Sequence, residues 1–304
     1  MHDQKKFKVI SFYEFIYIDN IEQLKIKLYA FLKNNYTKGT VLLASEGINA
    51  TLSCEDKYHF KVLEFINNTL KNKVNYKIHN YSEHAFLRLK VKIKKEIIKL
   101  NQKNISPEKR TGKYINPQEW DKLIKDKNII TIDTRNYYES EIGTFKGSLK
   151  VNSHNFTQFP GWVKKNEKYL KGKKIAMFCT GGIRCEKASS YLINNGYKEV
   201  FQLDGGVISY LKTTKNKKKS WIGECFVFDD RVSLSEKLLR GNHEQCFACR
   251  SAISKKEKNS SNYKEGIYCP KCKNQTSREK KMSFEERNRQ MKIAKRKGIK
   301  HLGS

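Results

Sequence analysis

The sequence predicts an α/β protein in three parts: an N-terminal α+β domain, a central domain with a parallel sheet, and a small cysteine-rich C-terminal region. Three observations carry this prediction. Strand-like and helix-like segments follow one another in different orders on the two sides of a polar stretch at 99–113. Four cysteines lie in two close pairs near the C-terminus. The 304 residues also exceed the usual size of one domain, which is about 150 residues.

The N-terminal domain is predicted from alternating patterns of period two and period 3.6. Apolar residues of the first helix, such as Ile21, Leu24 and Leu28, recur at helical spacing. The turn at Glu46-Gly47 separates two short strands. This order, β-α-β-β-α-β, is typical of a ferredoxin-like (acylphosphatase-like) domain, expected over residues 1–98. The expected elements are a strand at 7–18, a helix at 20–34, two strands within 40–53, a helix at 55–70 and a strand at 85–98.

The polar stretch at 99–113 contains Pro107 and Gly112 and is predicted to be a linker. A different pattern of strands and helices follows it. Strands then alternate with helices, which indicates a parallel sheet covered on both faces over residues 114–213. Residues 214–304 form the basic, cysteine-rich C-terminal region. The expected elements of the central domain are helices at 115–126, 161–170, 186–197 and 206–212, and strands at 128–135, 173–179 and 200–206.

The chain is strongly basic. It has 62 Lys and Arg against 31 Asp and Glu, a formal net charge of +31. Such a charge favours polyanionic partners, nucleic acid first, although a general bias of the sequence toward Lys, Asn and Ile would also produce it. No apolar run reaches the roughly 18 residues of a membrane helix, and the N-terminus shows no export signal. We therefore expect a cytoplasmic protein without membrane contact, whose cysteines are thiols or metal ligands.

One loop between a predicted strand and a predicted helix has the chemistry of a reactive thiol. It consists of Cys179, Thr180, Gly181, Gly182, Ile183, Arg184 and Cys185. We expect Cys179 to face the crevice at the C-terminal edge of the parallel sheet. The two glycines let backbone N–H groups converge, and both Arg184 and the positive end of the next helix favour a thiolate. The same amides would hold an anion or a persulfide.

The alternative is a buried cysteine followed by an ordinary strand-to-helix turn. Loop length argues against a third interpretation, a cysteine phosphatase. Arg184 follows Cys179 with four intervening residues, whereas phosphate-handling loops have the spacing C-x5-R. The tighter ring of amides suits a sulfur atom on cysteine better than a phosphoryl group.

The spacing of four C-terminal cysteines indicates a metal site. Cys246-x2-Cys249 and Cys269-x2-Cys272 are typical of a zinc ribbon with four thiolate ligands and a structural role. The alternative is four unpaired thiols in a flexible segment. The seven histidines contain no pair at helical spacing, so a histidine metal site is not expected.

Longer motifs carry a family resemblance. CTGGIRCEKAS, IDTRNYYESEIGTFKGS and LDGGV resemble a rhodanese domain. The resemblance implies that Cys179 carries the persulfide and that Asp133 and Arg135 support the active site. Together with KGTVLLASEGINATLS, FPGWVKKN and GECFVFDDRVSL, these motifs are similar to the rhodanese-related tRNA uridine-34 hydroxylases, over about residues 7–275.

This resemblance implies oxygen-dependent hydroxylation of the wobble uridine at C5, with molecular oxygen as co-substrate and the tRNA anticodon region as partner. Cys179 would act through a persulfide or a sulfenate, or by adding to C6 of the uracil. Cys185 would either resolve an oxidised Cys179 or simply pack as a small side chain. Glu46, Gly47 and Asn49 would either meet the substrate or form a turn. The lysine run at 215–219 and the basic tail around KRKGIK suit RNA phosphates.

Two other functions compete with this one. A rhodanese-type sulfurtransferase would move sulfane sulfur to an acceptor, with a protein persulfide as a possible donor. A non-catalytic RNA-binding protein would keep the loop without using it. The intact Cys179 and Arg184 argue against the second, and the N-terminal domain and GECFVFDDR argue against a minimal sulfurtransferase.

Overall fold

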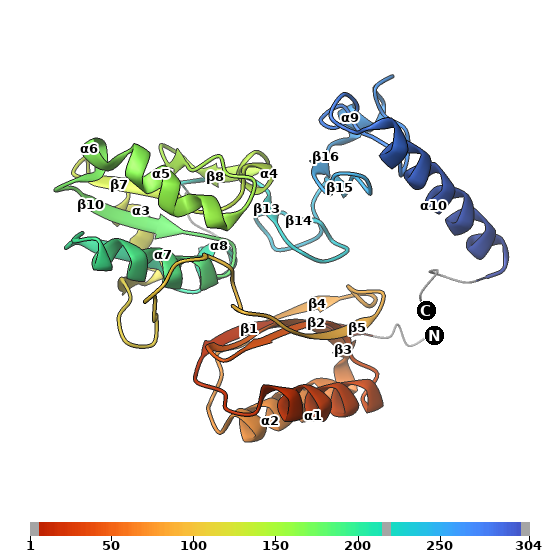
Figure 1. Ribbon diagram of the computed structural model, residues 1–304, viewed down its shortest axis with the longest axis horizontal. Coiled ribbons are helices and arrows are strands. Elements are labelled where there is room, and N and C mark those ends of the chain that lie inside the picture. The colour runs from red at the N-terminus through yellow and green to blue at the C-terminus, as the bar shows by residue number, and fades with distance from the viewer. Residues whose placement is uncertain (1–5, 215–219, 299–304) are drawn as a thin grey trace. The chain divides into compact units, whose positions relative to one another are not determined.

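The computed structural model describes residues 6–214 and 220–298 (Figure 1). The lysine run at 215–219 and residues 299–304, which end the basic tail, lie outside the described residues. The chain forms two compact units, each assembled from separate stretches of sequence. The first comprises Met1–Tyr114, Phe156–Lys174 and Ile183–Gln202, and the second comprises Ile115–Asn155, Ile175–Gly182 and Leu203–Ser304.

The N-terminal part is an α+β domain with a five-stranded sheet in the order β4-β1-β3-β2-β5. β1 pairs antiparallel with β3 and β4, β2 pairs antiparallel with β3, and β5 pairs parallel with β2. The two long helices lie side by side on one face of this sheet (Figure 1). Its elements are β1 (Phe7–Phe15), α1 (Ile21–Asn34), β2 (Lys38–Ala44), β3 (Gly47–Glu55), the 3-10 helix η1 (Asp56–Tyr58), α2 (His59–Leu70), β4 (Lys77–Tyr81) and β5 (Leu89–Ile93).

The apolar periodicity of the N-terminal sequence explains this packing. Leu28 and Leu32 of α1 and Val62 and Ile66 of α2 are buried in one core with the inward side chains of the strands. The ring of Phe31 stacks on another ring of the helix pair, and Asn20 caps α1 by accepting a hydrogen bond from the amide of the third helical residue. The predicted α+β domain is therefore confirmed.

The end of this domain differs from the expectation. The sequence predicts one closing strand at 85–98. The structure has β5 within this range and a further strand, β4, before it. β4 completes the ferredoxin-like order, whereas β5 extends the open edge beside β2. β4 escapes sequence analysis because KIHNY is a half-exposed edge strand whose polar side chains give no apolar alternation.

The central part contains the predicted parallel sheet, with the strand order β6-β11-β10-β7-β9. Asn116 caps the first helix, and Pro117 occupies its first turn as expected. Gly196, at a φ of +86°, follows the end of α7. The elements are β6 (Lys113–Ile115), α3 (Pro117–Leu123), β7 (Ile129–Asp133), α4 (Tyr137–Ser140), β8 (Gly143–Phe145), β9 (Leu149–Lys150), η2 (Phe156–Gln158), α5 (Phe159–Lys165), α6 (Glu167–Leu170), β10 (Lys174–Phe178), α7 (Ile183–Asn194), β11 (Val200–Leu203) and α8 (Gly206–Thr213).

The C-terminal region consists of short strand pairs and a long basic helix. β12 pairs with β8, β13 with β14, and β15 with β16. The sequence predicts no helix in the basic tail, because α10 has few apolar residues, yet Lys, Arg, Glu and Gln are good helix formers and Ser277 caps the start. Within residues 6–214 and 220–298, every helix is too short or too polar to cross a bilayer. The elements are β12 (Trp221–Gly223), β13 (Cys225–Phe226), β14 (Ser233–Leu234), β15 (Glu244–Gln245), β16 (Ala252–Ile253), α9 (Lys255–Lys258) and α10 (Arg278–Arg296).

A buried lysine joins α7 to the N-terminal domain within the first compact unit. Lys187 is 2% exposed, and its Nζ lies 2.7 Å from Glu46 Oε2 and 2.6 Å from Glu96 Oε2. Burial by itself would raise the pKa of Glu96, but hydrogen bonds, led by that from Lys187, hold the pKa below its ordinary value. The lysine charge is thus shared between two carboxylates from different segments.

We predict that Lys187→Met lowers the free energy of unfolding by about 2–3 kcal/mol, because it leaves two partly buried carboxylates without their cation. Urea denaturation would measure the loss. Lys174→Met is the matched control, since it removes the half-exposed pair between Lys174 and Glu199 (3.0 Å) and should cost about 0–1 kcal/mol. Equal losses in the two variants would contradict the prediction.

Candidate active-site loop and cysteine cluster

The predicted loop connects β10 to α7 and is fixed to α8 through its backbone. The carbonyl of Cys179 accepts a hydrogen bond from the Val207 amide (3.0 Å), and that of Thr180 accepts one from the Ile208 amide (3.1 Å). Gly206 makes this approach possible. It has a φ of +67°, and a Cβ atom there would lie 2.5 Å from the Cys179 carbonyl oxygen. The start of α8 therefore holds the loop carbonyls in place.

The sulfur of Cys179 is held from inside the loop. Gly182, at a φ of +104°, donates its amide hydrogen to Cys179 Sγ over 3.1 Å. A glycine at this φ lets the chain curl so that the amide meets the sulfur. An amide donor stabilises negative charge on sulfur, as the sequence analysis anticipates for this loop.

The accessibility of the thiol differs from the expectation. The sequence predicts that Cys179 faces an open crevice, but the residue is 0% exposed. The physical reason is the attachment of the loop to α8, together with the contact that Thr180 makes on its other side with β13. Only Gly181 and Ile183 of the loop are partly exposed. In this arrangement the sulfur is covered.

Arg184 and Cys185 lie in the first turn of α7, and both are buried. Neither Cys185 nor Cys179 forms a disulfide bond. The effect of the Arg184 charge on the loop stays a prediction. The role of Cys185, either resolving an oxidised Cys179 or packing, also stays open.

Asp133 and Arg135 form a buried ion pair behind the loop. Arg135 Nη2 lies 2.6 Å from Asp133 Oδ2, and both side chains are 0% exposed. Burial pulls the pKa of Arg135 down, but the charge and hydrogen bonds of Asp133 outweigh it and the pKa is raised. The same Nη2 donates to the Gly143 carbonyl (2.6 Å), and the guanidinium lies over the rings of Phe178 and Trp221. The pair therefore supports the end of β10 without facing solvent.

A residue that sequence analysis misses, Glu139, lies beside the loop. Its side chain is buried and caps α4 at Asn136, while its Oε2 accepts a hydrogen bond from Thr180 Oγ1 (3.3 Å). The same hydroxyl donates to the Phe226 carbonyl over 3.5 Å. The spacing of Asn136 and Glu139 is that of a capping box, which is the signal in the sequence that would have found this residue.

Cys225 lies in β13, next to the carbonyl that contacts Thr180. It is a free, buried thiol, and burial raises its pKa to about 12, although the charge of Arg135 opposes the rise. The charge of the Cys179 thiolate adds to the rise in the pKa of Cys225. At neutral pH, Cys225 is therefore a neutral, packed side chain.

Glu46, Gly47 and Asn49, at the turn of the N-terminal domain, make contacts within the fold. Glu46 accepts a hydrogen bond from the Ile97 amide (2.7 Å) besides its ion pair with Lys187, and Asn49 donates to the Ile97 carbonyl (3.1 Å). Gly47 approaches β1 so closely that a Cβ atom would lie 2.0 Å from a backbone oxygen. Of the two interpretations that the sequence leaves open for these residues, the contacts favour the turn.

The four C-terminal cysteines come together, as their spacing predicts. The sulfur atoms of Cys246, Cys249, Cys269 and Cys272 all lie within 4.8 Å of one another. Cys269 Sγ is 3.7 Å from Cys249 Sγ and 3.8 Å from Cys272 Sγ. Four sulfurs placed about 2.3 Å from one tetrahedral ion would be roughly 3.8 Å apart. The donor set and its spacing therefore fit one tetrahedral metal ion.

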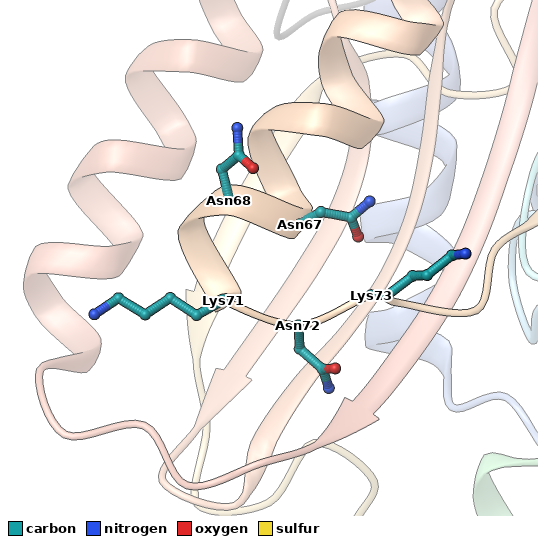
Figure 2. Close-up of a pocket in the computed structure, with 5 residues that line it drawn as sticks. All are labelled: Asn67, Asn68, Lys71, Asn72 and Lys73. Atoms are coloured by element: carbon teal, nitrogen blue, oxygen red, sulfur yellow. The ribbon is translucent and has the colours of Figure 1, made fainter.

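A surface depression in the first compact unit has different chemistry. It lies where α2 ends and is lined by Asn67, Asn68, Lys71, Asn72 and Lys73 (Figure 2). Asn67 Oδ1 accepts from the Val74 amide and the Tyr76 hydroxyl, and Asn72 donates to Glu14. Its lining amides thus shape the connection to β4. No thiol or carboxylate lines it, so we do not assign a reaction to this place.

Comparison with known families finds a match for two parts of the chain. Residues 116–213 match the rhodanese-like domain, so the central part is a rhodanese domain. Residues 7–97 match the UPF0176 acylphosphatase-like domain. These two domains in this order are the architecture of the UPF0176 family.

Solved structures with similarity to the chain share little sequence with it. A rhodanese-related protein from Thermoplasma volcanium has 21% identity and a TM-score of 0.28, over 35% of this chain and 95% of that one. A protein of unknown function from Rhodopseudomonas palustris, described as a possible tyrosine phosphatase, has 19% identity and a TM-score of 0.30, over 34% and 81%. The reduced CoADR-RHD protein of Bacillus anthracis has 16% identity and a TM-score of 0.34, over 62% and 37%.

A buried carboxylate follows the loop in α7. Glu186 accepts hydrogen bonds from the hydroxyls of Tyr13 and Tyr114, both over 2.8 Å. Thr111 and Gln202 donate to the same group, over 3.1 and 3.3 Å. Burial nevertheless raises the pKa of Glu186, because these donors offset only part of the desolvation.

We predict that this carboxyl makes the protein less stable as pH rises above the ordinary titration range of glutamate. The folded state holds the proton more tightly than the unfolded state, so raising the pH through the folded pKa costs stability. Urea unfolding of the wild type and of Glu186→Gln at several pH values from 4 to 7 would test this. The variant should lose less free energy of unfolding than the wild type as the pH rises. Equal pH dependence in the two proteins would contradict the assignment.

Proposed function

We propose that this protein hydroxylates the wobble uridine of tRNA at C5, in an oxygen-dependent reaction that uses Cys179. The main support is the combination of a UPF0176 acylphosphatase-like domain with a rhodanese domain. In the loop of the rhodanese domain, the Gly182 amide contacts the Cys179 sulfur. The rhodanese domain suggests sulfur chemistry, and the pairing of domains favours the more specific reaction. The substrate makes the cytoplasm the proposed place of action.

The role of the thiol has three chemically distinct forms. Cys179 would carry a persulfide, act as a sulfenate, or add to C6 of the uracil so that C5 becomes nucleophilic. Each of them requires the sulfur to reach its reaction partner. Because Cys179 is covered, we propose that the loop moves when RNA binds, and Gly181 and Ile183 are its partly exposed positions.

The charge of the C-terminal region supports RNA as the partner. On α10, Glu285 already pairs with Lys264 (2.8 Å), and Glu286 pairs with Arg289 (2.8 Å). The remaining cations leave the helix with a basic surface suited to phosphates, which supply affinity without base identity. The exposed basic residues of α10 are Arg278, Lys280, Arg289, Lys292, Lys295 and Arg296.

We propose that the cysteine cluster binds structural zinc. When bound, zinc would cross-link the two cysteine pairs of a region that has little apolar core. The cluster also anchors α10, because Arg287 Nη2 donates to the carbonyls of Phe247 (3.1 Å) and Gly266 (2.8 Å), which lie beside the two pairs. The metal would thus stabilise the segments to which α10 is attached.

Elemental analysis would test the metal site. We expect about one zinc ion per chain, and loss of the ion in Cys269→Ser because three thiolates close the site poorly. Cys54→Ala is the matched control, since Cys54 is a buried free thiol in β3 outside the cluster. Wild-type protein that folds without bound metal would contradict the assignment.

Nucleoside mass spectrometry would test the reaction. In cells lacking the gene, the wild-type protein should restore 5-hydroxyuridine in bulk tRNA, whereas Cys179→Ser should lower it to the background of the deletion strain. Cys54→Ala again serves as the control. Unchanged 5-hydroxyuridine with Cys179→Ser would end all three roles of the thiol.

The same measurement separates the competing functions. The rhodanese domain favours a sulfurtransferase as the second candidate, with a protein persulfide as donor. In that case the deletion strain would lose a thiolated nucleoside and keep 5-hydroxyuridine. A purely RNA-binding protein would leave both modifications unchanged.

A further inference from the structure

An exposed phenylalanine stands beside the candidate loop. Phe228 is 61% exposed and follows β13, whose carbonyl at Phe226 accepts the hydrogen bond from Thr180. The rings of Phe226 and Phe228 meet edge to face, with centroids 5.2 Å apart. Phe226 itself is buried and contacts the Tyr138 ring at 5.3 Å. Two contacts thus connect an exposed ring to the residue after Cys179.

Several contacts hold the segment that presents Phe228. Asp229 and Arg231 form a two-pronged ion pair, with Nε–Oδ1 and Nη2–Oδ2 distances of 2.8 and 2.6 Å, and both side chains are almost fully buried. The Val227 amide donates to the Val232 carbonyl (2.9 Å) and closes the turn. Val232 has a φ of +64°, which a β-branched residue adopts only where its surroundings impose it.

Exposure alone would not single out this residue, since isolated apolar side chains are common on protein surfaces. Phe60, on α2, is 75% exposed and adjoins a histidine ring within the N-terminal domain. The difference lies in the connection of Phe228 to the candidate loop through Phe226 and Thr180.

We propose that Phe228 is a platform on which the unstacked wobble base of the RNA substrate stacks. This inference rests on the proposed function and adds the residue that contacts a base. The excess of 62 basic over 31 acidic residues complements an RNA backbone. A single-stranded loop offers bases whose faces are free, and aromatic rings bind them by stacking. A phenylalanine has no hydrogen-bonding group, so it contributes affinity and orientation but does not select the base.

Binding of two anticodon stem-loop RNAs to the full-length protein tests this platform. One RNA carries uridine at the wobble position, and the other carries an abasic residue there. Phe228→Ala should weaken binding of the first RNA about 10-fold and binding of the second much less, because only the first has a base to stack. Phe228→Trp should restore binding and should show fluorescence quenching by the intact RNA beyond that of the wild type.

Phe60→Ala is the control variant, and its affinity for both RNAs should equal that of the wild type. The inference is overturned if Phe228→Ala binds the intact RNA as the wild type does, or if it loses the same affinity for both RNAs. Failure of the proposed function is a separate result: the wild type would form no 5-hydroxyuridine, whereas base-dependent binding through Phe228 would still be measurable.

Discussion

The ion pair between Asp133 and Arg135 is the constraint on which the candidate loop depends. Two fully buried charges are costly unless their geometry is good and their remaining hydrogen-bonding groups are satisfied. Here the guanidinium binds the carboxylate, the Gly143 carbonyl and two aromatic faces, and Asp133 also accepts from Thr144. The Thr134 amide and hydroxyl both donate to the Phe178 carbonyl, one residue before Cys179. The position of the sulfur is therefore set by charges that never meet solvent.

Buried charges are also paired in α7, where several of the buried residues after the loop are polar. Lys187 is satisfied by Glu46 and Glu96, and Glu186 by two tyrosine hydroxyls and further donors. The side chains of Glu46, Glu186 and Lys187 thus bind one another or other residues of the protein. Within the loop itself, only Gly181 and Ile183 are partly exposed, and this makes Phe228 informative.

Much of this organisation is readable from the chain. The α+β and parallel-sheet domains follow from periodicity, and the sulfur cluster follows from the spacing of two cysteine pairs, since both are local properties of the sequence. Sequence patterns do not reveal β4 and α10, because the polar residues of these elements give no apolar periodicity. The burial of Cys179 and the contact of Glu139 with Thr180 depend on segments far apart in the sequence, namely α8, β13 and α4, and no local pattern encodes such contacts.

The burial of Cys179 also has a consequence for the lifetime of the protein in the cell. Peroxides and alkylating agents attack thiolates that they can reach, and repeated attack by peroxide ends in irreversible sulfonic acid. A sulfur that is buried within its own loop is out of reach of these agents in this conformation. The fold thus shields a thiol whose proposed reactivity and whose vulnerability have the same chemical origin.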